Sequence, residues 1–148
     1  MMKRRYFLQG LLLTTAALLM APARLLAAIW NKPAFEATTL DGANQGLQIS
    51  AAQVSSDIEI ILPQKAENGA VVQIEVMSRI PNTESVLILA EKNPTPLIAN
   101  FQFAQGTEPY VVTRIKLAET GDVQVIVKAD KQYFTASRRI EVLENGCG

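Results

Sequence analysis

Histidine is absent from the 148-residue chain, and cysteine occurs only once, as Cys147. Without histidine the chain cannot form a Ser-His-Asp or Cys-His catalytic site, nor a histidine-ligated zinc or haem centre. A single cysteine allows neither an internal disulfide bond nor a cluster of thiolates around a metal ion. We therefore expect no catalytic residue and no metal ligand, which excludes most enzyme classes.

The first 28 residues have the composition of an export signal. A basic start is followed by an apolar run from Leu11 to Ala21 and then by small residues, and the run is too short to span a bilayer. Arg4 and Arg5 are followed, after one residue, by two apolar ones, which is the twin-arginine export pattern. The alternative is an ordinary secretory signal that contains adjacent arginines. Either signal predicts a periplasmic protein that has no membrane association after the signal is removed.

Loss of residues 1–28 makes the remaining chain acidic. The segment contains four of the 14 basic residues and none of the 14 acidic ones, so 10 basic residues remain against 14 acidic ones, a net charge of −4. A mildly acidic domain has no electrostatic attraction for nucleic acid or for anionic lipid. Nucleic acid is therefore excluded as a partner.

Between residues 56 and 143 the apolar residues alternate with polar ones, as they do in half-buried β-strands. Glycine, proline and asparagine separate the alternating segments, for example at 67–69 and 120–122. Seven short strands at this spacing predict an all-β, immunoglobulin-like antiparallel β-sandwich that spans residues 29–143 as one domain. We expect the strands within segments 57–63, 70–78, 85–92, 97–104, 110–117, 123–130 and 133–143.

The segments before and within this pattern carry two further expectations. Pro33 predicts the first turn of a short N-terminal helix over residues 34–45, which Gly46 would end. Phe35 and Leu40 would form its thin apolar face. The segment 85–90 is apolar on both faces of a strand, so it either faces the core and the helix or is covered by a partner protein.

Residues 144–148 form a predicted flexible C-terminal arm around the only thiol. Gly146 and Gly148 lack a Cβ atom, and Asn145 tolerates left-handed backbone angles. The adjacent groups are the Glu144 carboxylate and a terminal carboxylate, which favour the protonated thiol rather than a reactive thiolate. The arm therefore presents Cys147 without activating it, as a carrier would. An incidental cysteine or an intermolecular disulfide bond is the alternative.

Three stretches of the chain resemble the SoxY family, the sulfur-carrier subunit of the periplasmic thiosulfate-oxidising (Sox) system. They are "AENGAVVQIEV" at 66–76, the long segment 91–130, which begins "EKNPTPLIANFQF", and the terminal Gly-Cys-Gly. The resemblance implies an immunoglobulin-like sandwich, a twin-arginine signal and sulfur intermediates held covalently on Cys147, with no other cofactor. SoxY tails usually read Gly-Gly-Cys-Gly-Gly. Here Asn145 replaces the first glycine, and the last glycine is missing.

The resemblance also implies the partners. SoxY proteins form a heterodimer with SoxZ and meet a c-type cytochrome complex, a thiosulfohydrolase and a sulfur dehydrogenase in turn. The chain itself would be a non-catalytic carrier, because those active sites belong to the other proteins. The competing hypothesis from the residues alone is an exported structural or interaction module whose terminal cysteine is incidental or forms an intermolecular disulfide.

Overall fold

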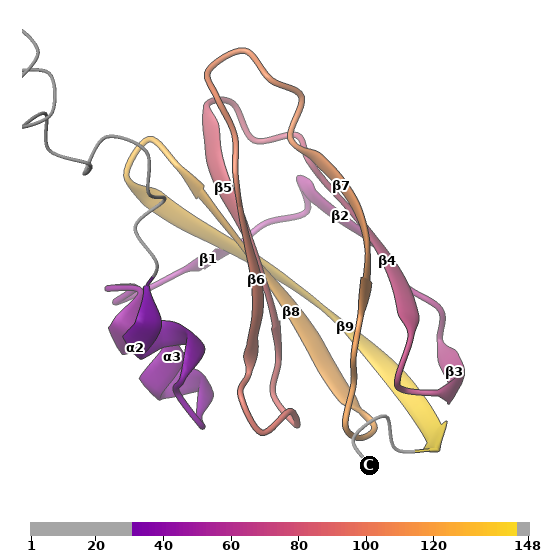
Figure 1. Cartoon of the computed structure of the whole chain (residues 1–148). Helices are drawn as coiled ribbons and strands as arrows, with labels where there is room; N and C mark the ends of the chain where they lie inside the picture. Colours follow the sequence, from indigo (N-terminus) through magenta and orange to yellow (C-terminus); the bar gives the residue numbers. More distant parts are fainter. Residues whose placement is uncertain (1–30, 145–148) are drawn as a thin grey trace, which may run out of the picture. The chain divides into compact units, whose positions relative to one another are not determined.

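The computed structural model describes residues 31–144, which form two short helices and nine strands (Figure 1). The helices are α2 (Lys32–Phe35) and α3 (Leu40–Gly46). The strands are β1 (Gln53–Val54), β2 (Ile58–Ile61), β3 (Lys65–Asn68), β4 (Val72–Ser78), β5 (Thr83–Ala90), β6 (Leu97–Gln102), β7 (Tyr110–Ile115), β8 (Gly121–Ala129) and β9 (Gln132–Glu144).

The strands form two sheets that pack face to face. The larger sheet has the order β1-β9-β8-β5-β6, with β3 also paired to β9, and the smaller sheet has the order β2-β4-β7. The chain crosses from one sheet to the other after each of the strands β1, β2, β3, β4, β6 and β7, while β5–β6 and β8–β9 are hairpins within the larger sheet. The immunoglobulin-like sandwich and all seven predicted strands are confirmed.

Two strands were not predicted, and both run parallel to β9. β1 pairs near the start of β9, with Gln53 opposite Phe134, and β3 pairs near its end, with Asn68 opposite Glu144. An antiparallel sandwich was expected, but these two pairings are parallel, so the prediction is wrong in this respect. The predictions of turns at 67–69 and 120–122 are also wrong in part, because only Gly69 lies outside β3 and only Thr120 lies outside β8. β1 and β3 are too short and too polar to show an alternating pattern.

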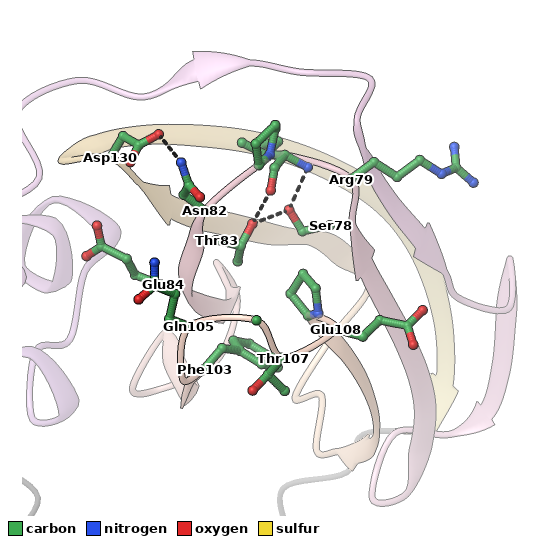
Figure 2. Close-up of a pocket in the computed structure, with 14 residues that line it drawn as sticks. Ser78, Arg79, Asn82, Thr83, Glu84, Phe103, Gln105, Thr107, Glu108 and Asp130 are labelled. Carbon is green, nitrogen blue, oxygen red and sulfur yellow. Dashed lines mark hydrogen bonds between the residues drawn. The ribbon is translucent and has the colours of Figure 1, made fainter.

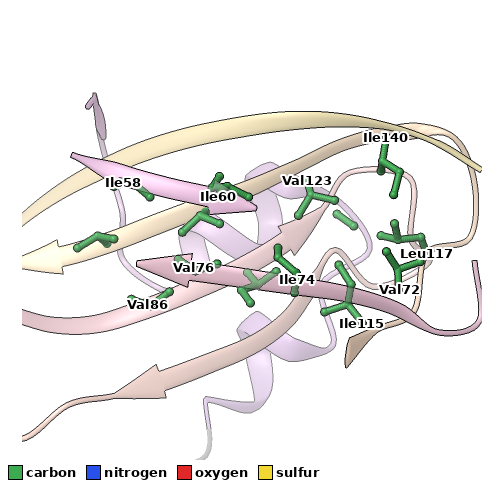
Figure 3. Packing of buried hydrophobic residues seen from close by; sticks show 14 of the residues in the cluster. Ile58, Ile60, Val72, Ile74, Val76, Val86, Ile115, Leu117, Val123 and Ile140 are labelled. Atoms are coloured by element: carbon green, nitrogen blue, oxygen red, sulfur yellow. The ribbon is translucent and has the colours of Figure 1, made fainter. Parts of the chain in front are cut away.

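Apolar packing between the two sheets forms the main core (Figure 3). Alternate residues of β4 are buried, with Ile74 and Val76 fully inaccessible, and they face Val86 and Val123 of the larger sheet. Each such side chain contributes about 1.5–3 kcal/mol when it is fully buried. This packing holds the two sheets of the described chain together.

The outer face of β5 is covered by the helices. Leu87 and Leu89 pack in a second apolar cluster with Ala34 of α2 and Ala43 of α3, whereas the alternate residues of β5 face the main core. The apolar segment 85–90 is thus buried on both faces within this one chain. No partner protein is needed to cover it.

The prediction of one helix over residues 34–45 is wrong. α2 ends at Phe35, and Thr39 takes an extended conformation (φ −137°, ψ 154°) before α3 begins. The Oγ1 atom of Thr39 accepts a hydrogen bond from the backbone N–H of Gly42, which caps the new helix at its N-terminus. Phe35 and Leu40 were expected on one helix face; they lie on α2 and α3 respectively, and both pack against the second cluster.

The predicted export signal lies outside the described residues, so Arg4, Arg5 and the cleavage of residues 1–28 stay predictions. No helix between residues 31 and 144 is long and apolar enough to cross a bilayer.

Candidate functional site: the base of the C-terminal arm

The predicted site residues Asn145, Gly146, Cys147 and Gly148 lie outside the described residues, which end at Glu144. Glu144 was expected to begin the flexible arm, but it is the last residue of β9. Its partner in the sheet is Asn68 of β3, and this pairing extends β9 one residue beyond the predicted end. The predicted arm can therefore begin no earlier than residue 145.

β3 fixes one edge of β9 at the point where the arm begins. The carbonyl oxygen of Glu144 accepts a hydrogen bond of 3.0 Å from the backbone N–H of Gly69. Lys65 lies opposite Glu141, and the Lys65 Nζ and Glu141 Oε2 atoms are 3.7 Å apart. Both of these side chains are more than half exposed, so the ion pair adds little stability and the backbone pairing holds the edge.

Thr120 holds the backbone of β9 at Val142. The backbone N–H of Val142 donates to Thr120 Oγ1 over 2.8 Å, and the same hydroxyl donates to the Val142 carbonyl over 3.2 Å. Thr120 precedes β8, the other strand beside β9, so the two restraints come from separate segments. The end of β9 is therefore a fixed base for the arm.

The position of this base limits where the thiol can act. Cys147 is three residues beyond Glu144, and a chain spans at most about 3.3–3.6 Å per residue. Whatever conformation residues 145–147 adopt, the backbone of Cys147 remains within about 10 Å of Glu144.

A cleft of about 750 Å³ lies toward the opposite end of the sandwich (Figure 2). It is lined by the loops that follow β4 and β6 and by Asp130 in the turn between β8 and β9. β9 is 13 residues long and so extends about 40 Å, and the cleft lies near its start whereas the arm leaves from its end. Cys147 therefore cannot reach the cleft of its own chain.

Several polar groups of the cleft wall are hydrogen-bonded to one another. Asn82 donates to Asp130 over 3.0 Å, and the hydroxyl groups of Ser78 and Thr83 are 2.8 Å apart. Thr83 also donates to the carbonyl of Ile80 over 2.8 Å. These hydrogen bonds stabilise the loops that line the cleft.

The outer face of the smaller sheet exposes apolar side chains. Ile61, Tyr110 and Val112 are 55%, 43% and 52% exposed, three of the six large apolar residues that stand out from the described surface. Tyr110 Oη donates to Glu75 Oε2 over 2.8 Å, and this hydrogen bond to a carboxylate raises the pKa of the Tyr110 hydroxyl.

Within residues 31–144, no three histidine, cysteine, aspartate or glutamate side chains gather closely enough to hold a metal ion.

Comparison with known proteins identifies the family. The model of the family described as "Sulfur oxidation protein SoxY" matches residues 45–147, which is more than half of the chain and includes Cys147. The chain belongs to the SoxY family. The match covers every strand described above together with the residue proposed to carry sulfur.

A solved structure of another SoxY protein has the same fold. The sulfur carrier protein SoxY from Chlorobium limicola f thiosulfatophilum is 33% identical in sequence and superimposes with a TM-score of 0.66. The similarity covers 76% of this chain and 99% of the Chlorobium chain. No curated protein sequence matches the chain.

The sequence did not predict the residues that hold the end of β9 in this SoxY protein. Thr120 and Gly69 were both expected in turns, and nothing in the local pattern connects either residue with β9. Only the pairing of segments far apart in the sequence brings Thr120, Asn68 and Gly69 to the end of that strand.

Proposed function

We propose that this SoxY protein is a covalent sulfur carrier that holds intermediates of thiosulfate oxidation on Cys147. The observation that carries the proposal is the family match, which extends through residue 147 and so includes the only thiol of the chain. The Chlorobium protein of the same fold is described as a sulfur carrier. A thiol on a residue whose backbone lies within about 10 Å of a fixed strand end is suited to presentation to other proteins.

The chemistry at Cys147 needs partner enzymes at every step. Joining the thiol to thiosulfate forms an S–S bond, gives Cys–S–S–SO3− and releases a proton and two electrons, which a c-type cytochrome complex accepts. A thiosulfohydrolase then adds water, releases sulfate and two protons, and leaves a persulfide, Cys–S–S−. A sulfur dehydrogenase oxidises the remaining sulfane sulfur. The carrier supplies the attachment point and no catalytic group.

The proposal includes a permanent partner and a compartment. A heterodimer with SoxZ is the working form in this family, and SoxZ carries no export signal of its own. The twin-arginine route exports folded proteins, so a signal with Arg4 and Arg5 would carry the assembled pair to the periplasm. The thiosulfate-oxidising enzymes are in that compartment.

Replacement of Cys147 by serine tests the carrier role. In a reconstituted system that contains the partner enzymes and SoxZ, Cys147→Ser should abolish thiosulfate-dependent electron release, because no sulfur can be attached. The melting temperature should not change, since residue 147 lies beyond the last strand. Alkylation of the wild-type thiol with iodoacetamide should produce the same loss. Full turnover by the serine variant would overturn the proposal.

The competing hypothesis is a structural or interaction module with an incidental or disulfide-linking cysteine. Mass spectrometry of the C-terminal peptide, taken from cells that grow on thiosulfate, separates the two. The carrier hypothesis expects mass additions of one or more sulfur atoms or of a sulfonate group on Cys147. A thiol that stays unmodified under these conditions supports the module instead.

A further inference from the structure

The outer face of the smaller sheet is a single surface, because strand pairing places its residues side by side. Glu75 of β4 lies opposite Ile61 of β2 on one side and opposite Val112 of β7 on the other. Met77, two residues along β4, lies opposite Tyr110 in the same way. A buried residue stands next to each of these five in its strand, and successive residues of a strand point to opposite faces. All five side chains therefore share the outer face, on the side of the sandwich away from the helices (Figure 1).

Two charged groups on this face have no partner of opposite charge within residues 31–144. Glu75 accepts a hydrogen bond of 3.2 Å from Gln73 Nε2 and one of 2.8 Å from Tyr110 Oη, but it forms no ion pair there. Arg114 is exposed and lies opposite Gln73 on β7. Its guanidinium group contacts no carboxylate of the described chain. One unpaired charge of each sign thus remains on the same surface.

A hollow of about 130 Å³ lies beside the Glu75 carboxylate. Its lining consists of Glu59, Ile61, Glu75, Met77 and Tyr110. Glu59 is already paired with Arg79, so Glu75 is the carboxylate that is left to bind a cation. A long basic side chain suits this site, because its apolar stem covers the apolar lining while its charged end meets the carboxylate.

The Arg114 of the same chain does not fill the hollow. It is four residues from Tyr110 along β7, a distance of about 13 Å, and it is not among the residues of the lining. A second copy of the chain supplies the same arginine from a different direction.

A two-fold axis brings the unpaired charges of two copies together. Let the axis cross the strands at the row of Ile61, Glu75 and Val112, so that the strands of the second copy run the opposite way. Arg114 and Tyr110 are each two residues from Val112, on opposite sides of it, so Arg114 of each copy then lies over Tyr110 of the other. There the guanidinium group can stack on the ring and reach the Glu75 carboxylate, which Tyr110 Oη holds close by. Ile61 and Val112 meet their own counterparts at the axis.

We infer that the chain without SoxZ forms a two-fold dimer through this face, in which Arg114 of each copy pairs with Glu75 of the other. The contact is made twice, as two-fold symmetry requires. A partner that carried charge of only one sign would leave either Arg114 or Glu75 without a counter-charge, whereas a second copy satisfies both. The dimer goes beyond the proposed carrier function and does not depend on a cargo on Cys147.

The size of the face sets the strength of the dimer. β4 has seven residues and is about 23 Å long, and three strands at about 4.8 Å spacing are about 15 Å wide. This is less than half of the roughly 800 Å² that a standard interface buries on each partner. The dissociation constant should therefore fall in the micromolar range, and it should rise with salt.

Sedimentation velocity of the mature chain without SoxZ tests the dimer. Iodoacetamide first alkylates Cys147, so that no disulfide bond can link two copies. The wild-type chain should change from monomer to dimer as its concentration rises through the micromolar range. Glu75→Arg and Arg114→Glu should each raise the dissociation constant at least tenfold, because each places two like charges in contact. Wild-type protein that stays monomeric, or single variants that dimerise as tightly as the wild type, would overturn the inference.

An equal mixture of the two single variants separates a contact between copies from one within a chain. In the mixed dimer, Arg114 of the Glu75→Arg chain meets Glu75 of the Arg114→Glu chain, and the two introduced residues meet each other with opposite charge. The mixture should dimerise with a dissociation constant within about twofold of the wild-type value, although neither variant does so by itself. Within each single chain the two charges are alike, so an ion pair inside one chain cannot produce this rescue. A mixture that remains monomeric counts against the dimer.

The matched control is Arg139→Glu, the same charge change on β9 of the larger sheet. Arg139 is exposed and its ion pair with Asp122 is more than half exposed, so the variant should fold and keep the wild-type dissociation constant. Thermal melting by circular dichroism identifies any variant that fails to fold. For that case Glu75→Gln removes the charge but keeps an oxygen that accepts from Tyr110, and it should weaken the dimer severalfold. An unchanged dissociation constant for Glu75→Gln would contradict the role of the charge.

Discussion

A single hydroxyl group holds both backbone polar atoms of Val142. Thr120 Oγ1 accepts a hydrogen bond from the Val142 N–H and donates one to the Val142 carbonyl. One side chain thus satisfies the two backbone groups that a neighbouring strand would otherwise pair. Val142 itself is only 8% exposed, and an unsatisfied backbone group there would be costly. At the residue scale, Thr120 thus secures the end of β9, the last strand before Cys147 in the sequence.

Replacement of Thr120 by valine should destabilise the domain. Valine has nearly the same shape but leaves both groups of Val142 without these partners, a loss of about 1–3 kcal/mol. Urea denaturation measures the free energy of unfolding, and amide hydrogen exchange at Val142 should quicken locally. Thr120→Ser is the control, because serine keeps the hydroxyl. Equal free energies of unfolding for the valine and wild-type proteins would show that the two hydrogen bonds make no net contribution to stability.

The two helices together cover the outer face of β5 in the larger sheet. They meet where Gly46 lies against Ala34, and Asn31 Nδ2 donates to the Gly46 carbonyl over 2.8 Å. A Cβ atom added to Gly46 would come within 2.8 Å of the Ala34 Cα atom. The close approach allows both helices to cover Leu87 and Leu89 of β5 at once.

Gly46→Ala tests this contact between the helices. Alanine normally favours a helix over glycine by about 1 kcal/mol, so a neutral site would gain stability. Here the new methyl group meets backbone atoms that cannot move aside, and we expect a net loss of about 1–3 kcal/mol in urea denaturation. Gln45→Ala, on an exposed position of the same helix, should change stability little. A more stable Gly46→Ala protein would contradict the packing described here.

At the scale of the whole domain, one face is left uncovered by residues 31–144. The helices cover β5, but Ile61, Tyr110 and Val112 remain exposed on the smaller sheet. Exposed apolar residues gathered on one face favour association between proteins. The mature chain by itself should therefore self-associate.

Light scattering checks this expectation. The mature chain alone should give a mass above that of a monomer, and addition of SoxZ should convert it to a 1:1 complex. Ile61→Lys, which places a charge on the face, should lower the mass of the chain alone. A monomer that ignores SoxZ would contradict both the association and the proposed heterodimer. Ile61 is not at the end of β9, so iodoacetamide should alkylate Cys147 equally in the wild-type protein and in Ile61→Lys.

The sequence by itself determined the seven main strands and the only thiol. Alternation of apolar and polar residues is a local property, so β4 could be predicted without knowing what it packs against. The position of Cys147 needed no structure, because a lone cysteine beyond the last strand is visible in the printed chain.

Tertiary structure decided how the arm is anchored and what covers β5. β1 and β3 are too short to be stable strands by themselves, and they exist because β9 offers a free edge to each. The role of Thr120 depends on Val142, 22 residues further along the chain. Helix α2 ends at Phe35 and α3 begins at Leu40, and residues of both helices pack against Leu87 and Leu89. These outcomes arise from contacts between distant segments, which no local pattern contains.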